Sequence, residues 1–150
     1  MLSIYLDTNI YIFGLLDGKS GSAVVLREVL KRDIMVVQSD YLFDEVLHWF
    51  REHKGKDSVG LVRTYLLTLP CREFVNKAEW SYFLLKVKDD VADRDDLPHI
   101  CSYFAGGAEY FVTTNRRLTQ MKIRGKVNFL SPEEFLRVIG GSDDTVSKDE

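Results

Sequence analysis

Two patterns of apolar residues alternate along the first part of the chain. Apolar runs of strand length lie at Ser3–Leu6 and Ile34–Val37, whereas apolar residues recur at helical spacing from Ser22 onward. A second helix is predicted to begin after an N-cap at Ser39 and to end near His53. Its apolar face consists of Leu42, Val46, Trp49 and Phe50. This order of strand and helix indicates a βαβ arrangement.

The middle of the chain has the pattern of two helices with a short strand between them. The helices are predicted over Val59–Leu69 and Lys77–Lys88, and the strand over Cys71–Val75. We expect the two helices to pack against each other over the sheet.

The last part of the chain returns to the same alternation. A helix over Pro98–Ala105 should stop at the glycine pair Gly106-Gly107, and strands are predicted at Glu109–Thr113 and Val127–Leu130. A final helix, running through Ile139, opens on a capping box formed by Ser131, Pro132 and Glu134.

Strands that alternate with helices are typical of an α/β protein. We therefore predict a three-layer α/β/α sandwich with a mainly parallel central sheet of about five strands. No internal repeat or long linker divides the sequence, so residues 1–140 should form one domain. Residues 141–150 should be a disordered polar tail.

The composition agrees with a globular chain. Of its 150 residues, 45% are hydrophobic and 29% are charged. Cys71 and Cys101 lack the spacing of a zinc site or a disulfide framework, so they are interpreted as reduced, buried thiols. There is no membrane-spanning run and no basic segment before the first apolar stretch, so we expect a cytoplasmic protein and no membrane partner.

The net charge of −3 does not exclude a nucleic-acid partner. It is accounted for by the segment 142–150, which holds four acids and one lysine, so the rest of the chain is neutral. What matters for a polyanion is where lysine and arginine lie locally.

Four polar residues lie near predicted strand ends or on the helices that follow them, where parallel sheets bind their ligands. Each has a structural alternative. Asp7 and Asn115 are also typical turn residues, and Glu45 is also typical of a helix border that reaches water. Asp96 could cap a helix, a task open to its neighbours Asp93 and Asp95 as well.

Taken together, these residues are three acids and an amide that can converge on one crevice. Gathered carboxylates repel one another, so proteins usually neutralise them with a hard cation. An oxygen-only donor set favours magnesium or manganese over zinc.

Four segments of the chain resemble the PIN domain family, which contains metal-dependent ribonucleases, VapC-type toxins among them. They occur in the family's order, and with the gaps between them they cover most of 1–138: Tyr5-Leu6-Asp7-Thr8-Asn9, Ser39 to Val46 with Glu45, Asp93 to Ile100, and Gly107 to Asn115. The resemblance implies that Asp7, Glu45 and Asp96 bind the metal and act in catalysis. Thr8, Asn9, Asp93 and Thr113 are additional candidates.

Asn115 departs from the family pattern. Many members carry a fourth acid there, and the resemblance therefore makes Asn115 a member of the catalytic set with an oxygen donor but no charge. A second ion should bind more weakly than it would with aspartate, and activity itself could be reduced.

The resemblance also implies the reaction, which is hydrolysis of RNA phosphodiester bonds. One or two Mg²⁺ or Mn²⁺ ions would orient a water, lower its pKa and stabilise charge on the phosphate. No histidine nucleophile is required, so His48, His53 and His99 are interpreted as surface or packing residues. Only His99 lies close enough to Asp96 to merit a test.

Basic residues indicate where RNA could bind. Between residues 115 and 126 there are five cations and no acid, and we expect Arg116, Arg117, Lys122 and Arg124 to contact single-stranded RNA. The alternative is a solvated basic loop. A second cluster consists of Arg51, His53, Lys54 and Lys56.

Several functions remain open at this point. The ribonuclease could be the toxin of a toxin–antitoxin pair, with an antitoxin protein as partner, or an RNA-processing enzyme. The alternative class is an RNA-binding or scaffolding module without turnover, which Asn115 favours and the three acids oppose. An aspartyl phosphotransferase ranks low because Asn9 stands where a second acid is needed. Aromatic residues that could form a homodimer contact or belong to the core are Trp49, Phe50, Trp80 and Tyr82.

Overall fold

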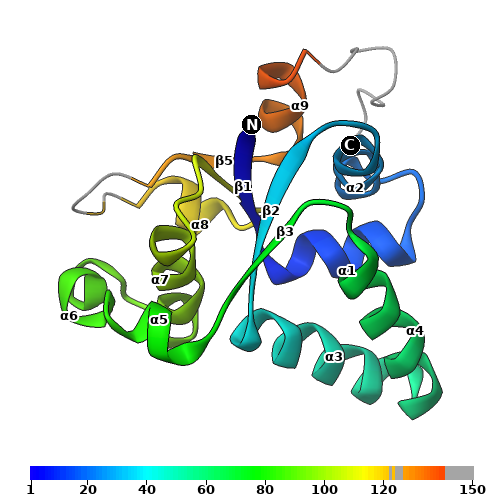
Figure 1. Cartoon of the computed structure of the whole chain (residues 1–150), viewed down its shortest axis with the longest axis horizontal. Helices are drawn as coiled ribbons and strands as arrows, with labels where there is room; N and C mark the ends of the chain where they lie inside the picture. Colours follow the sequence, from blue (N-terminus) through cyan, green and yellow to red (C-terminus); the bar gives the residue numbers. More distant parts are fainter. Residues whose placement is uncertain (122, 124–126, 141–150) are drawn as a thin grey trace.

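One parallel sheet organises the chain (Figure 1). The structure is a computed structural model that describes residues 1–121, 123 and 127–140. Within these residues the sheet has the order β3-β2-β1-β4-β5, and every pairing is parallel. The strands are β1 (Leu2–Leu6), β2 (Ile34–Ser39), β3 (Arg72–Val75), β4 (Tyr110–Val112) and β5 (Phe129–Leu130). The predicted α/β class and parallel sheet are confirmed.

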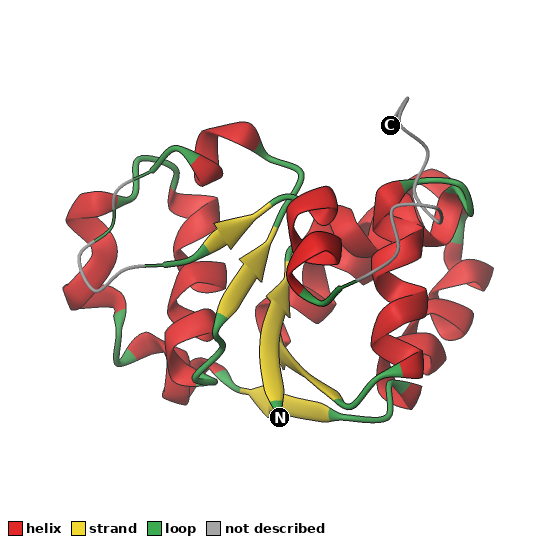
Figure 2. Cartoon of the chain, turned by 90° about the horizontal axis from the view of Figure 1, so that it is seen from above, coloured by secondary structure: helices red, strands yellow, loops and turns green. Residues whose placement is uncertain are grey.

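Helices cover both faces of this sheet (Figure 2). They are α1 (Thr8–Leu16), α2 (Gly21–Lys31), α3 (Asp40–Lys54), α4 (Lys56–Thr68), α5 (Lys77–Ser81), α6 (Leu84–Val87), α7 (Leu97–Ala105), α8 (Arg116–Thr119) and α9 (Pro132–Val138). Two short 3-10 helices, η1 (Lys88–Asp90) and η2 (Arg94–Asp96), precede α7. The three-layer arrangement is therefore as expected.

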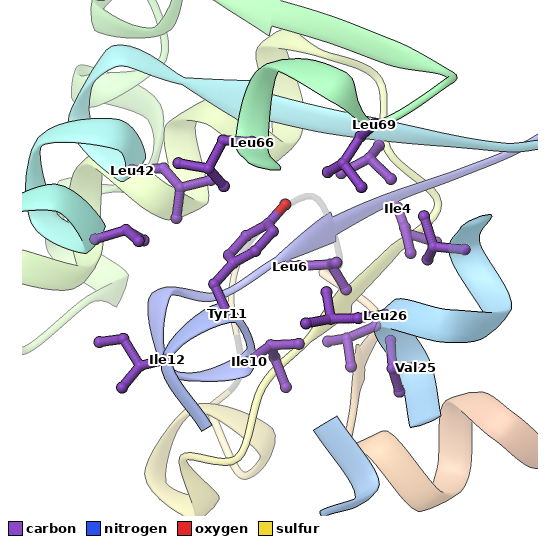
Figure 3. Packing of buried hydrophobic residues seen from close by; sticks show 14 of the residues in the cluster. Ile4, Leu6, Ile10, Tyr11, Ile12, Val25, Leu26, Leu42, Leu66 and Leu69 are labelled. Atoms are coloured by element: carbon purple, nitrogen blue, oxygen red, sulfur yellow. The ribbon is translucent and has the colours of Figure 1, made fainter. Parts of the chain in front are cut away.

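The alternation of side chains along β1 creates two separate cores. Ile4 and Leu6 pack with residues of α1, α2, α3, α4 and α9, whereas Tyr5 packs with residues of α5, α6, α7 and α8. Figure 3 shows the first core, in which Tyr11 of α1 lies among Leu42 and Leu66 from α3 and α4. The three central strands, β1, β2 and β4, are thus largely buried on both faces, as in other α/β proteins, whereas the edge strand β3 exposes Arg72, Glu73 and Phe74.

The structure corrects one packing prediction. α4 packs against α3, and α5 and α6 pack against α7 on the other face of the sheet. The expected contact between the helices at 59–69 and 77–88 is therefore wrong. The reason is that β3 is the edge strand, after which the chain crosses to the opposite face to reach β4. The segment 77–88 also divides into α5, α6 and the start of η1.

Two helices, α1 and α8, were not predicted from the sequence pattern. α1 buries three consecutive residues, Ile10, Tyr11 and Ile12, and so it lacks the apolar stripe that marks an amphipathic helix. α8 has a single turn of four residues, too short to show a period. Both helices begin at residues of the expected site, namely Asp7 and Asn115, which are their N-caps.

Gly106 allows α7 to approach the sheet closely. A Cβ atom at this position would lie 2.3 Å from Val37 Cγ1 on β2. The next residue, Gly107, has a positive φ of 67°, a conformation that glycine adopts without strain and that turns the chain toward β4. Gly106 therefore sets the distance between α7 and β2, and Gly107 turns the chain into β4.

Three expectations from composition meet different outcomes. Neither cysteine forms a disulfide, as predicted, but only Cys101 is buried, whereas Cys71 is half-buried. No helix in the described ranges is long and apolar enough to cross a bilayer. The predicted tail at 141–150 lies outside the described residues.

Candidate active site

A cavity of about 370 Å³ lies beyond the carboxyl ends of β1 and β4. Elements far apart in the sequence contribute its lining, because parallel strands end at the same edge of the sheet. Six of the predicted site residues line it, namely Asp7, Thr8, Asn9, Glu45, Asp96 and Asn115. His48, Trp49, Glu52, His53, Asp95 and His99 also contribute to the lining. Thr113 and Asp93 lie outside it.

Asp7 is held rigidly at the end of β1. Its Oδ1 accepts a hydrogen bond from the Thr8 backbone N–H at 2.8 Å, and its Oδ2 accepts one from the Thr113 hydroxyl at 2.8 Å. The side chain is 8% exposed, and Thr113 is fully buried behind it. Thr113 thus orients Asp7 from the neighbouring strand end without reaching the cavity itself.

Glu45 reaches the cavity from the second turn of α3. Ser39 caps this helix as predicted, since its Oγ accepts a hydrogen bond from the Leu42 N–H at 3.1 Å. The carboxylate Oε1 accepts the Thr8 hydroxyl at 2.6 Å and lies 2.5 Å from His99 Nε2. Glu45 therefore joins α3 to both α1 and α7 across the mouth of the sheet.

His99 links Glu45 to the interior of the protein. It is 3% exposed, and its Nδ1 lies 2.6 Å from the hydroxyl of Tyr5 on β1. Both ring nitrogens are thus engaged, one by Tyr5 and one by Glu45. His99 is buried, in line with a packing residue, but its bond to Glu45 was not predicted. The available signal was its spacing of three residues from Asp96, which places both near one face of a helix.

The Glu45–His99 contact shifts both pKa values in the directions of an ion pair. Burial by itself would lower the pKa of His99, but its hydrogen bond to Glu45 and the nearby charges of Asp7, Glu45 and Asp96 raise it overall. Burial would raise the pKa of Glu45, but the bonds from His99 and Thr8 lower it overall. Glu45 is thereby kept ionised beside the cavity.

Asp96 is the acid whose surroundings most oppose ionisation. Partial burial, followed by the charges of Asp93 and Asp7, raises its pKa from 3.8 to about 6. Asp96 occupies the N-cap position of α7, but its side chain makes no capping hydrogen bond. The local turn is capped by Asp93, whose Oδ1 accepts the Asp95 N–H at 2.9 Å. The helix-cap alternative therefore applies to Asp93 and not to Asp96.

Asn115 combines a cavity position with a structural task. Its Oδ1 accepts the Arg117 N–H at 3.0 Å and so caps α8. Its own backbone N–H donates to Thr113 Oγ1 at 3.0 Å, which connects it to the residue that orients Asp7. The turn role considered for Asn115 is therefore present, and the side chain still faces the cavity.

The donor set fits a hard divalent cation by its chemistry. Carboxylate and amide groups of Asp7, Glu45, Asp96 and Asn115 line one cavity. The raised pKa of Asp96 reflects its partial burial and, after that, nearby carboxylate charges that a cation would offset. As the side chains stand, the described residues hold no group of three or more His, Cys, Asp and Glu close enough to bind a metal ion. Small side-chain movements would therefore accompany binding.

Neither Arg116 nor Arg117, the two predicted RNA-binding residues that the structure describes, lines this cavity. Arg116 lines a separate cavity of about 640 Å³ that also contains Asp17, Glu133 and Glu134. Arg117 lies 3.8 Å from Asp93 in an exposed ion pair. Lys122 and Arg124 lie outside the described residues.

The four aromatic residues considered for a homodimer contact differ in how far they are buried. Phe50 and Trp80 belong to the two cores, and Trp49 is half-buried at the edge of the first core. Tyr82 is 69% exposed. Of the four residues, Tyr82 therefore offers the largest free surface.

The fold and the site together define a class: α/β proteins with a parallel sheet and a cavity lined by acidic side chains beyond the carboxyl ends of the strands. A family model described as PIN domain matches residues 3–117. The chain therefore belongs to the PIN domain family. Comparison with curated proteins finds no match.

Solved structures show the same fold. A chain of the VapBC2 structure from Rickettsia felis, bound to a promoter DNA fragment, aligns with a TM-score of 0.68 at 15% identity, covering 87% of this chain and 98% of that one. DNA-bound VapBC from Salmonella typhimurium gives 0.60 at 16%, covering 88% and 99%. VapC20 of Mycobacterium tuberculosis, described as a sarcin-ricin loop cleaving toxin, gives 0.52 at 16%, covering 72% and 86%.

Proposed function

We propose that this PIN domain is a divalent-metal-dependent ribonuclease that hydrolyses phosphodiester bonds in RNA. One observation carries the proposal: Asp7, Glu45 and Asp96 come from three distant parts of the chain and line the same cavity. These acids match the residues that the family resemblance assigns to metal binding. A ribonuclease in this family also agrees with the neighbour described as a sarcin-ricin loop cleaving toxin.

Each acid has a distinct part in the proposed site. Asp7 is the fixed ligand, because Thr8 and Thr113 hold both of its oxygens. Glu45 is kept ionised by His99, and Asp96 loses its proton most readily when a cation offsets its neighbours' charge. When bound, Mg²⁺ or Mn²⁺ supplies a Lewis acid for the phosphate and a water of lowered pKa. Asn115 offers an oxygen to a second, weaker site.

The biological setting is proposed from the structural neighbours. Two of them are VapBC complexes, so we place this chain as the toxin of a toxin–antitoxin pair, with an antitoxin protein as its partner and the cytoplasm as its location. An RNA-processing role uses the same chemistry. A homodimer through the exposed Tyr82 is part of the same proposal.

A second candidate is an RNA-binding or scaffolding module without turnover. Asn115 favours it, because an amide replaces a charged oxygen and is already engaged in capping α8. The two candidates differ in one measurable respect, which is cleavage.

The test is cleavage of labelled single-stranded RNA by purified protein with Mg²⁺, Mn²⁺ or EDTA. We expect metal-dependent cutting that disappears in Asp7→Asn and Asp96→Asn. Asp33→Asn is the matched control, because Asp33 is exposed and directly precedes β2, at the amino ends of the strands and away from the cavity. RNA that binds without being cut, with cutting restored by Asn115→Asp, would support the binding module instead.

A further inference from the structure

One face of α3 forms a wall of the acidic cavity. Glu45, His48, Trp49, Glu52 and His53 all line it, at spacings of three and four residues. The wall continues past Glu45 to the exposed carboxyl end of the helix, and the acidic site is therefore open toward that end.

This wall carries a flat aromatic pair. The rings of Trp49 and His53 are stacked with centroids 4.2 Å apart and planes 12° apart. His53 Nδ1–H donates to the Trp49 carbonyl oxygen at 2.9 Å, which fixes the orientation of the imidazole. Trp49 is anchored against the core, whereas His53 is exposed. The outer surface of the pair is thus available to a further flat ring.

A third cavity, of about 460 Å³, lies between α3 and α4. It adjoins the acidic cavity, because Glu45 and His48 line both cavities. Two arginines from different helices, Arg51 of α3 and Arg63 of α4, line it. A chain that leaves the acidic cavity over His48 therefore arrives between these two guanidinium groups.

The two arginines are not neutralised by their surroundings. In the part of the chain that the structure describes, neither forms an ion pair or a side-chain hydrogen bond. Of the two acids in this cavity, Glu45 is already bonded to Thr8 and His99, which leaves Asp44 as the counter-charge. The cavity thus has an unmatched positive charge.

We infer that single-stranded RNA crosses the acidic site over α3, with one base stacked on the Trp49–His53 pair on one side of Glu45 and a phosphate between Arg51 and Arg63 on the other side. Aromatic platforms interleaved with cations are the usual way in which proteins hold a single strand. This inference rests on the proposed ribonuclease function and extends it by naming the substrate path.

The route over α8 that the sequence favoured is less suited to phosphate. Arg116 shares its cavity with three carboxylates, and Arg117 is already beside Asp93. A phosphate on that side would meet more negative than free positive charge. The charge distribution of the described residues therefore favours the α3 side.

The test measures binding of a fluorescein-labelled uridine oligonucleotide as a function of salt. It is done in an Asp7→Asn background, because asparagine also caps helices and cleavage should be absent. We expect Arg51→Gln and Arg63→Gln each to weaken binding about tenfold and to lower the salt slope by about 0.7. Trp49→Leu should weaken binding about tenfold with the slope unchanged, since stacking is not ionic.

Matched variants separate this path from general charge effects. Lys31→Gln removes an exposed cation at the end of α2, near the amino ends of the strands. It should change neither the affinity for the oligonucleotide nor the salt slope. Arg116→Gln tests the rival path. Because Trp49→Leu could disturb the core, His53→Ala at an exposed position serves as the second stacking variant.

The same substitutions in the active protein separate the two proposals. We expect KM for RNA to rise while kcat is retained. Normal metal-dependent cleavage with unchanged binding in the Arg51 and Arg63 variants would overturn the α3 path and leave the ribonuclease standing, as would a loss confined to Arg116→Gln. A change of oligomeric state on sedimentation, without any change in RNA binding, would identify a protein interface instead and overturn the path. No RNA binding or cleavage by the unaltered protein would overturn both.

Discussion

Thr113 and Asp7, which are 106 positions apart in the sequence, are joined by a buried hydrogen bond of 2.8 Å. The bond exists because β4 pairs in parallel with β1, so that both strands deliver their next polar residue to the same edge. It leaves Asp7 with little rotational freedom. The predictions below start from this rigid carboxylate and proceed to the acids around it.

Thr113→Val should lower the affinity for Mn²⁺ about 10- to 100-fold, because it removes the group that orients Asp7. It also leaves Asp7 Oδ2 and the Asn115 N–H without a partner, and it should therefore cost about 1–2 kcal/mol of stability. Metal titration by calorimetry and thermal unfolding measure the two effects. Thr113→Ser keeps the hydroxyl and should restore affinity. Unchanged affinity in a folded Thr113→Val variant would contradict the orienting role.

Asp96→Asn should stabilise the metal-free protein at pH 7. The folded-state pKa of about 6 exceeds the ordinary 3.8, so the charged carboxylate disfavours folding above pH 6. After allowance for solvent screening of a partly exposed group, the gain is about 1 kcal/mol. It should shrink between pH 6 and 4 and vanish below, where both folded and unfolded wild-type chains are protonated.

This pH dependence is measured by thermal unfolding in EDTA from pH 4 to 8. Asp33→Asn serves as the control, since it removes an exposed charge far from the cavity. In excess Mn²⁺ the order should reverse, because the variant loses a ligand and with it the stabilisation that a bound ion gives. A variant equally stabilised by Mn²⁺ would show that Asp96 is not a ligand.

Glu45→Gln should lower the pKa of His99. The substitution removes a charged hydrogen-bond partner, whereas the burial that lowers the pKa of this imidazole remains. Titration of the imidazole by NMR in metal-free protein measures the change. Glu52→Gln, seven residues further along the same helix, is the matched control. An unchanged His99 titration would mean that the Glu45 contact does not set its protonation.

The Glu45–His99 contact also predicts how the stability of the fold changes with pH. The folded-state pKa of His99 is raised, so its stabilising contribution is complete below the ordinary value of 6.5 and is lost as pH rises through the folded value. The stability difference between wild type and Glu45→Gln should therefore be larger at pH 6 than at pH 9. A difference that grew with pH would have the wrong sign.

Asn115→Asp should strengthen divalent-ion binding about tenfold by adding a charged oxygen at the cavity. The fold should be preserved, because aspartate caps a helix as well as asparagine does, here through the Arg117 N–H. Asn115→Ala is the contrasting variant, which should lose the cap and about 1 kcal/mol of stability. Titration with Mn²⁺ compares all three proteins. Equal affinity in Asn115→Asp and wild type would place residue 115 outside the ion's reach.

Much of the fold could be predicted because its signals are local. The apolar runs at β1 and β2, the Ser39 cap and the Ser131 capping box depend on neighbours within a few residues, and the structure contains all of them. The residues of the candidate site could also be named in advance. Asp7 and Asn115 lie just after strand ends, which places them at one edge of any parallel sheet, whereas Glu45 and Asp96 lie on or beside helices and were named with them through the family resemblance.

Other features depended on contacts between distant residues. α1 buries three consecutive residues and exposes the apolar Phe13 and Leu16, so its apolar positions form no stripe that would mark a buried face before the surrounding elements enclose it. The separation of α4 from α5 and α6 follows from the edge position of β3, which local periodicity does not encode. The RNA path that we propose also depends on distant contacts, since Arg51 and Arg63 become neighbours of one cavity only when α4 packs on α3.

The sequence by itself determined the alternating elements, their caps and the identities of the acids. The tertiary structure alone decided that Glu45 meets His99 across 54 positions, that Thr113 orients Asp7, and that Asp93 caps a turn while Asp96 faces the cavity. The physical reason is the distance along the chain over which each interaction acts. Hydrophobic period and capping act within a helical turn, whereas a hydrogen bond or a shift in pKa depends on which groups the packed chain brings within a few ångströms.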